Sequence, residues 1–248
     1  MSDDTFFIGW ARRIPSGLGG FLARVSLGLL GAAGLLALAL SASIDDPGGG
    51  AFDWEAGEQT LRGILTPLPY PLLHLAPSVR HPAGHTVLLS GIGKNGAEVD
   101  AALAGRMVDA TGVMLKRGSI DMMQLGDDPG LRTAEGERAL SAPVQLGRWR
   151  LVGEICDGKC WTGGMRPGSG IAHQACAQLC LAGGIPPVLV TTSPVEGSTF
   201  LLLAGADGGP MPEALRPLVA VRLMLEGEVE RRGDLLVLRV APAGVHPL

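Results

Sequence analysis

The sequence has few charged residues, few aromatic residues and no basic cluster. Charged residues make up 18% and aromatic residues 4% of its 248 positions, and the formal net charge is −4. Lys and Arg never form a run longer than a pair, so the chain lacks the positive patch with which nucleic-acid-binding proteins contact phosphates. We therefore expect no nucleic-acid partner.

Recognisable catalytic motifs are also missing. The sequence contains no nucleophile elbow, no HExxH motif and no specific Ser/His/Asp arrangement, and we predict no enzyme activity. Residues 91–96 match GxGxxG, but the stretch that follows is too short for the helix of a dinucleotide site, which favours a glycine turn. His74, His81 and His85 lie in a proline-rich stretch without a cysteine or carboxylate to complete a metal site, which favours a surface loop.

One long run near the N-terminus has no charged side chain. Residues 25–44 are uncharged, and a helix of that length is about 30 Å long, which matches the hydrocarbon core of a bilayer. Arg12, Arg13 and Arg24 precede the run, whereas Asp45 and Asp46 follow it, so the positive-inside rule places the N-terminus in the cytoplasm. A cleaved signal peptide is the alternative, because Ala-Leu-Ser-Ala-Ser at 39–43 offers small residues near a cleavage position.

This run predicts a single-pass protein of the cell membrane that contacts membrane lipid. Residues 1–24 form the predicted cytoplasmic segment, residues 25–44 the membrane helix and residues 45–56 a linker. The bulk of the chain is then periplasmic or extracellular.

Beyond the linker the chain is rich in turn residues and poor in helical periodicity. The sequence contains 38 Gly and 18 Pro, and apolar residues alternate over short runs between them, as in strands joined by turns. Residues 112–125 align with residues 227–240, and each stretch has an Arg-Gly pair at its centre, which predicts a hairpin. Leu61-Arg-Gly63 and Leu151-Val-Gly153 precede these two hairpins in the same order.

We therefore predict a mainly β fold made of two OB-like small barrels, with residues 57–140 in the first unit and residues 141–248 in the second. A single larger β-sandwich is the alternative. In the second unit we expect strands at 149–155, 188–192, 199–204, 218–225 and 235–240. We also expect a helical turn at 211–216 and a short helix at 172–181 that carries two cysteines and ends at Gly183.

Cysteine occurs only four times, and all four residues fall within 25 positions: Cys156, Cys160, Cys176 and Cys180. Export would favour disulfides. Cys176 and Cys180 would have Cβ atoms about 6 Å apart on a helix, which is too far for a bridge. The predicted disulfides therefore link the first pair of cysteines to the second pair.

A metal site is the other interpretation of this segment. Cys156, Cys160, His173, Cys176 and Cys180 offer the soft ligands that zinc, copper or an iron–sulfur centre requires, and a thioether from a nearby methionine suits copper. His173, Cys176 and Cys180 would span about 10 Å along a straight helix, so all three cannot readily bind one ion.

The segment resembles one found in uncharacterised, membrane-anchored bacterial proteins. The resemblance rests on Lys159-Cys160, on His173-x-x-Cys176-x-x-x-Cys180 and on the Gly-Gly-x-Pro-Pro that follows. It implies an exported, anchored protein and assigns no catalytic role. In those proteins the position of Cys156 is often another residue, which implies a site of three cysteines and one histidine.

Two functional hypotheses follow. The first is a non-catalytic accessory or binding protein of the cell envelope, attached to other membrane or redox-complex subunits, with the cysteines as a disulfide staple or a metal site. The second is a redox protein of a membrane electron-transfer system, in which the cysteines hold a metal centre or act as redox-active dithiols.

Overall fold

The computed structural model describes residues 16–43, 48–79, 81, 84–127, 130–136 and 140–248. It divides into two units, Met1–Asp46 and Pro47–Leu248. Residues 1–15 of the predicted cytoplasmic segment, the last residue of the predicted membrane helix and residues 45–47 of the predicted linker lie outside the described residues.

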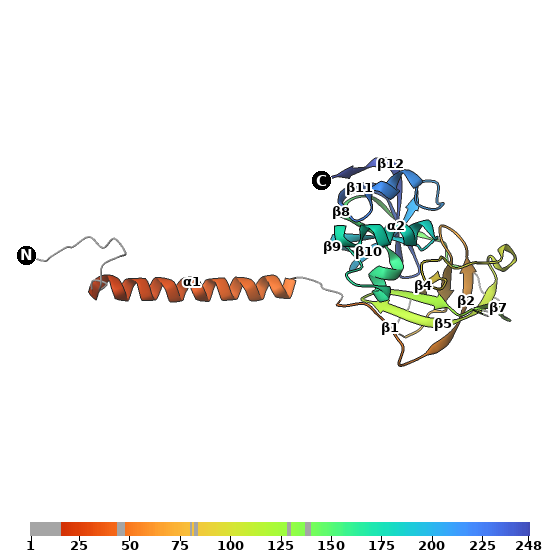
Figure 1. Cartoon of the computed structure of the whole chain (residues 1–248), viewed down its shortest axis with the longest axis horizontal. Coiled ribbons are helices and arrows are strands. Elements are labelled where there is room, and N and C mark those ends of the chain that lie inside the picture. The colour runs from red at the N-terminus through yellow and green to blue at the C-terminus, as the bar shows by residue number, and fades with distance from the viewer. Residues whose placement is uncertain (1–15, 44–47, 80, 82–83, 128–129, 137–139) are drawn as a thin grey trace, which may run out of the picture. The chain divides into compact units, whose positions relative to one another are not determined.

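The first unit contains the helix α1 (Ser16–Ser43), drawn in red and orange in Figure 1. Its stretch Gly17–Ala42 has a mean hydropathy of 2.1, and its length exceeds the about 20 residues that a membrane-spanning helix needs. The helix begins at Ser16, before the start predicted at residue 25. Arg24 therefore lies within the helix, where its Nε donates to the Gly20 carbonyl. By length and composition α1 can be a membrane span or a signal sequence.

The second unit begins with a closed ring of strands. β2 pairs with β3 and β5, β3 pairs with β4, β5 pairs with β6, and a parallel pairing of β4 with β6 completes the ring. Two short strands, β1 and β7, also pair with β5, both antiparallel. The elements of this first barrel are β1 (Ala51–Phe52), β2 (Glu58–Thr66), β3 (Leu72–Leu75), β4 (His85–Ser90), η1 (Ala101–Leu103), β5 (Met107–Arg117), β6 (Ile120–Leu125) and β7 (Leu131–Thr133).

A second closed barrel repeats the same pairing pattern. β8 pairs with β9 and β11, β9 with β10, β11 with β12, and β10 runs parallel to β12. The prediction of two OB-like barrels is therefore confirmed (Figure 1). The elements are β8 (Val144–Asp157), η2 (Cys160–Gly164), η3 (Ile171–His173), α2 (Gln174–Ala182), β9 (Pro187–Val195), β10 (Ser198–Gly205), η4 (Glu213–Leu218), β11 (Arg222–Arg232) and β12 (Leu235–Pro247).

Glycines explain why the two aligned stretches fold alike. Gly118 and Gly233 take φ values of 59° and 63° in the predicted hairpin turns, a conformation that other residues rarely adopt. A Cβ at Gly112 or Gly227 would collide with a carbonyl oxygen of the neighbouring strand. Only glycine lets these long strands approach their neighbours so closely.

One predicted strand of the second barrel is wrong in its first half. Residues 218–221 do not extend the strand: Leu218 ends the turn η4, and Ala220 has a φ of 64°. The chain thus reverses before β11 begins at Arg222. The predicted helix at 172–181 is present as α2, preceded by the short turn η3, and Gly183 caps its end as predicted.

The two barrels pack against each other through apolar side chains. Each barrel has its own core, and a third cluster combines buried residues of both, including Leu115 and Met122 of the first barrel with Phe200 and Val237 of the second. Burial of apolar surface is the main stabilising contribution in such a contact. The barrels therefore form one body, Pro47–Leu248.

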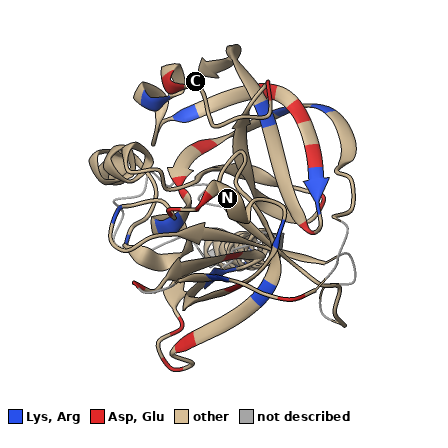
Figure 2. Ribbon diagram, turned by 90° about the vertical axis from the view of Figure 1, so that its right-hand side faces the viewer, with Lys and Arg blue, Asp and Glu red and all other residues tan. Residues whose placement is uncertain are grey.

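Charged residues of both signs follow one another along the strands of the second barrel (Figure 2). One of them is buried: Glu230 of β11 is 2% exposed. It accepts hydrogen bonds from Arg232 and Gln145 and lies 3.6 Å from Arg239. The pKa of Glu230 is lowered: burial acts to raise the pKa, and the hydrogen bonds from Arg232 and Gln145 outweigh that effect.

The substitution Glu230→Gln tests this ion pair. We expect the free energy of unfolding to fall by about 2 kcal/mol, less than the about 3–5 kcal/mol typical of a broken buried pair, because the arginines are partly exposed. A carboxylate with a lowered pKa stabilises the fold above its ordinary pKa, about 4.3, and less as the pH falls through the folded value. Urea unfolding of the detergent-solubilised chain at neutral and acid pH measures both effects.

The matched control is Glu226→Gln in the same strand, because Glu226 pairs with Arg148 and Arg150 at the surface. We expect little change in stability there. Equal losses in the two variants would contradict a special role for Glu230.

Candidate functional site

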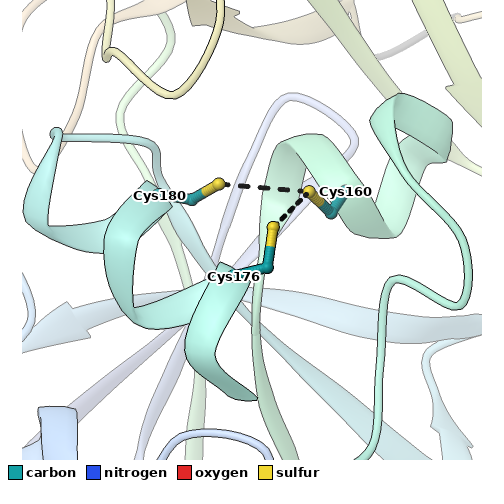
Figure 3. A group of neighbouring side chains, drawn as sticks. All are labelled: Cys160, Cys176 and Cys180. Carbon is teal, nitrogen blue, oxygen red and sulfur yellow. Dashed lines mark hydrogen bonds between the residues drawn. The ribbon is translucent and has the colours of Figure 1, made fainter. Parts of the chain in front are cut away.

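Three of the four cysteines meet between two short helical elements of the second barrel. Cys160 begins η2, three residues after the last residue of β8, and Cys176 and Cys180 lie one turn apart on α2. Figure 3 shows their sulfur atoms pointing toward one another. The Sγ of Cys160 is 4.0 Å from each of the other two, and all three sulfurs lie within 4.8 Å of one another.

This spacing distinguishes between a disulfide and a metal site. A disulfide needs about 2.05 Å between its sulfurs, and all four cysteines are free in the structure. Three thiolates bound to one ion at about 2.3 Å lie about 3.8 Å apart in tetrahedral geometry and about 4.0 Å apart in trigonal geometry. The observed 4.0 Å therefore fits a shared metal ion.

The three sulfurs differ in burial and in acidity. Cys160 and Cys180 are 5% and 1% exposed and pack on Ile185, whereas Cys176 is only partly buried. The hydrogen bond between Cys160 and Cys180 raises the pKa of Cys160 and lowers the pKa of Cys180. The site is therefore closed on one side, and Cys176 marks its open side.

A buried carboxylate holds the two cysteine-bearing elements together. Asp157, the last residue of β8, accepts a hydrogen bond from the Cys160 backbone N–H at 2.8 Å. Its other oxygen lies 3.0 Å from Nε2 of His173, which immediately precedes α2. Asp157 and His173 are 0% and 2% exposed. One side chain thus sets the positions of both η2 and α2.

His173 is beside the sulfur cluster and not within it. Its ring nitrogen, an oxygen of Asp157 and the Cys160 sulfur form a second group that could hold a metal. The turn η3 bends the chain before α2, so His173 does not continue the helix that carries Cys176 and Cys180.

Cys156 lies apart from the other cysteines. Side chains alternate along a strand, so Cys156 and Asp157 at the end of β8 face opposite sides. The Cys156 thiol donates to Glu154 and packs in the shared cluster between the barrels, and burial followed by the nearby Glu154 raises its pKa. Among the described residues, no metal-capable group includes Cys156.

Two lysines approach the sulfur cluster, and the sequence assigned neither of them a role there. Lys94, from the loop after β4, donates to the Cys176 sulfur at 2.7 Å and lies 3.8 Å from that of Cys180. The bond to Cys176 raises the pKa of Lys94. Lys159 is 4% exposed, and its burial lowers its pKa to about 8. Nearby positive charge favours thiolates, the form that binds metals.

The loop at residues 91–96, which matches a dinucleotide motif, brings Lys94 to the site. Lys159 donates to the carbonyls of Gly91 and Gly93, and the Gly96 N–H donates to the carbonyl of Gly183 at 2.7 Å. A Cβ at Gly183 would collide with the Lys94 carbonyl. Two glycine-rich segments therefore pack together and bring Lys94 to the cysteines.

A methionine adds a fourth sulfur at the open side. Met165 follows η2, and its Sδ lies 3.4 Å from the Cys176 sulfur. Its side chain is 45% exposed. A thioether is a weak, soft ligand, so this residue extends the donor set without closing the site.

No family model, no curated protein and no solved structure matches the chain. The function is therefore inferred from the geometry of the residues.

The substitution Asp157→Ala tests how the site is held. We expect a loss of about 3 kcal/mol in the free energy of unfolding, because two buried donors lose their acceptor. Each 1.4 kcal/mol is about tenfold in an equilibrium, so Cys160 and Cys180 should react at least about tenfold faster with a thiol reagent. Stopped-flow labelling with mass-spectrometric assignment measures these rates. The exposed aspartate Asp207, which caps a turn, provides the control Asp207→Ala, and equal labelling rates in the two variants would contradict the assigned role.

Proposed function

We propose that this chain is a membrane-anchored accessory protein of the bacterial cell envelope that binds one soft metal ion through Cys160, Cys176 and Cys180. The observation that carries the proposal is the 4.0 Å distance from the Cys160 sulfur to each of the other two, with all three sulfurs within 4.8 Å of one another. The lysines support it, because Lys94 and Lys159 offset part of the negative charge that three thiolates and one ion would carry.

Copper(I) is the ion that this donor set favours. Thiolates and thioethers together select copper(I) among the biological metals, whereas zinc uses thiolates, imidazoles and carboxylates. Met165 places a thioether beside Cys176. An iron–sulfur cluster requires four cysteines in its common form, and Cys156 faces away. Zinc in a three-cysteine site is the competing outcome.

The helix α1 supports a position at the membrane. Its length and composition fit a membrane span, and the arginines before it and aspartates after it favour a cytoplasmic N-terminus. The barrels would then lie in the periplasm or outside the cell. Anchoring keeps the metal site close to the bilayer, where membrane lipid and other membrane or redox-complex subunits are the partners we propose.

A redox role for the thiols is the second candidate. Cys160 is equally far from Cys176 and Cys180, so an approach of about 2 Å would close a disulfide with either one. Closing that disulfide would release two electrons and two protons, which a partner's disulfide or a quinone would accept.

Metal titration of the detergent-solubilised full chain tests the main proposal. With the thiols reduced under anaerobic conditions, we expect one equivalent of copper(I) to bind, in competition with a copper(I) chelator. Each of Cys160→Ser, Cys176→Ser and Cys180→Ser should weaken binding by at least about 100-fold, because each removes one of the thiolates.

The matched control is Cys156→Ser, which removes a buried cysteine outside the cluster and should leave affinity and stoichiometry unchanged. Binding that Cys160→Ser does not weaken would contradict the proposal. A reversible Cys160 disulfide without metal binding would instead support the redox candidate.

The topology can be tested in cells. We expect alkaline phosphatase fused after Leu248 to be active, because that enzyme folds only after export, and we expect the membrane fraction to contain the uncleaved chain by intact mass. A mass that lacks the segment through residue 43 would show that α1 is a signal sequence. An inactive fusion would place the barrels in the cytoplasm.

A further inference from the structure

Another group of side chains that could hold a metal lies away from the cysteines, where the two barrels meet. His81 precedes β4, His85 begins β4, and Asp234 occupies the turn between β11 and β12. Oδ2 of Asp234 is 2.6 Å from Nδ1 of His85 and 3.0 Å from Nδ1 of His81. The sequence around these two histidines contains no carboxylate, and the other barrel supplies one.

The far side of two of these groups already has a partner. Nε2 of His85 lies 2.9 Å from Asp121 of β6, and Oδ1 of Asp234 accepts the Thr86 backbone N–H at 2.9 Å. Metal-binding histidines usually donate their second ring N–H to a carboxylate, which orients the ring. Three donor atoms, two imidazole nitrogens and one carboxylate oxygen, thus lie within 4.8 Å of one another.

We propose that His81, His85 and Asp234 form a second metal site, which takes a divalent cation of the zinc class with water at the fourth position. Two imidazoles and one carboxylate are a common zinc donor set with an open position. Asp121 and Asp234 together carry the two negative charges that balance such an ion. Asp121 acts as a positioning residue, since it contacts His85 and not the ion.

The space around the cluster suits this assignment. His85 is 7% exposed, whereas the side chain of His81 is 36% exposed, so solvent reaches the cluster from the His81 side. Zinc ligands lie about 3.3 Å from one another in tetrahedral geometry, so Oδ2 of Asp234 needs to move less than about 1 Å farther from each ring nitrogen to admit the ion. A cavity of about 320 Å³ adjoins His85, which is enough room for a small ligand.

The competing interpretation is an ion pair between His85 and the two aspartates, which needs no metal. The two interpretations differ at His81: a metal site needs its imidazole, whereas the contacts of His85 with Asp121 and Asp234 do not. This site is also independent of the cysteine cluster, because it uses nitrogen and oxygen donors from other elements.

Zinc titration of the full chain in detergent tests the proposal. In a background of Cys160→Ser, Cys176→Ser and Cys180→Ser, we expect one equivalent of zinc to bind and the thermal unfolding temperature to rise, because the ion joins the two barrels. Cobalt(II) bound there should lack sulfur-to-cobalt charge-transfer absorption. In the chain with all cysteines intact, nitrogen–oxygen-bound cobalt should be present in addition to any sulfur-bound cobalt.

Variants of the histidine cluster complete the test. His81→Ala should weaken zinc binding at least about tenfold, and Asp121→Asn about 10- to 100-fold, the range typical of a lost partner of a ligand. His246→Ala, at an exposed position of β12, should change nothing. Unfolding without zinc checks that each variant folds. Absence of zinc binding in the cysteine-free background, or equal affinity in His81→Ala, would overturn this proposal and leave the copper(I) site untouched.

Discussion

Apolar side chains from both barrels form one shared cluster, and both polar sites depend on that contact. Packing Leu115 and Met122 against Phe200 fixes the first barrel relative to the second. As a result Lys94 of the first barrel reaches a sulfur of the second, and Asp234 of the second reaches a histidine of the first. Neither set of donors and charges is complete within one barrel.

The two barrels share their strand pairing and differ mainly in one connection. In the first barrel β2 and β3 are joined by residues 67–71, whereas residues 158–186 join β8 and β9. The longer connection holds η2, η3 and α2, and therefore Cys160, Cys176 and Cys180. A barrel needs only a short turn at this point, so the added segment can carry chemistry without disturbing the strands. Asp157 attaches that segment to the end of the barrel.

The barrels were predictable because their determinants are local. Gly118 and Gly233 mark turns, and alternating apolar residues mark strands, so the repeated pattern can be found in the sequence. The clustering of cysteines predicted a site, but Lys94 and Asp234 come from distant segments whose contact no local pattern shows. The sequence could also have shown that Cys156 does not join the other three cysteines. The predicted strand ended at residue 155, and two more residues would have put Cys156 and Asp157 on opposite faces.

The repeated barrel also lets the two halves of the body differ from each other. Two copies on one chain are the covalent equivalent of a dimer, with a linker that keeps the local concentration of each copy high. A symmetric dimer of identical chains must repeat every substitution at both ends of its interface. A tandem pair is free of that constraint, because each copy has its own stretch of sequence. Lysine in one copy can therefore face cysteine in the other.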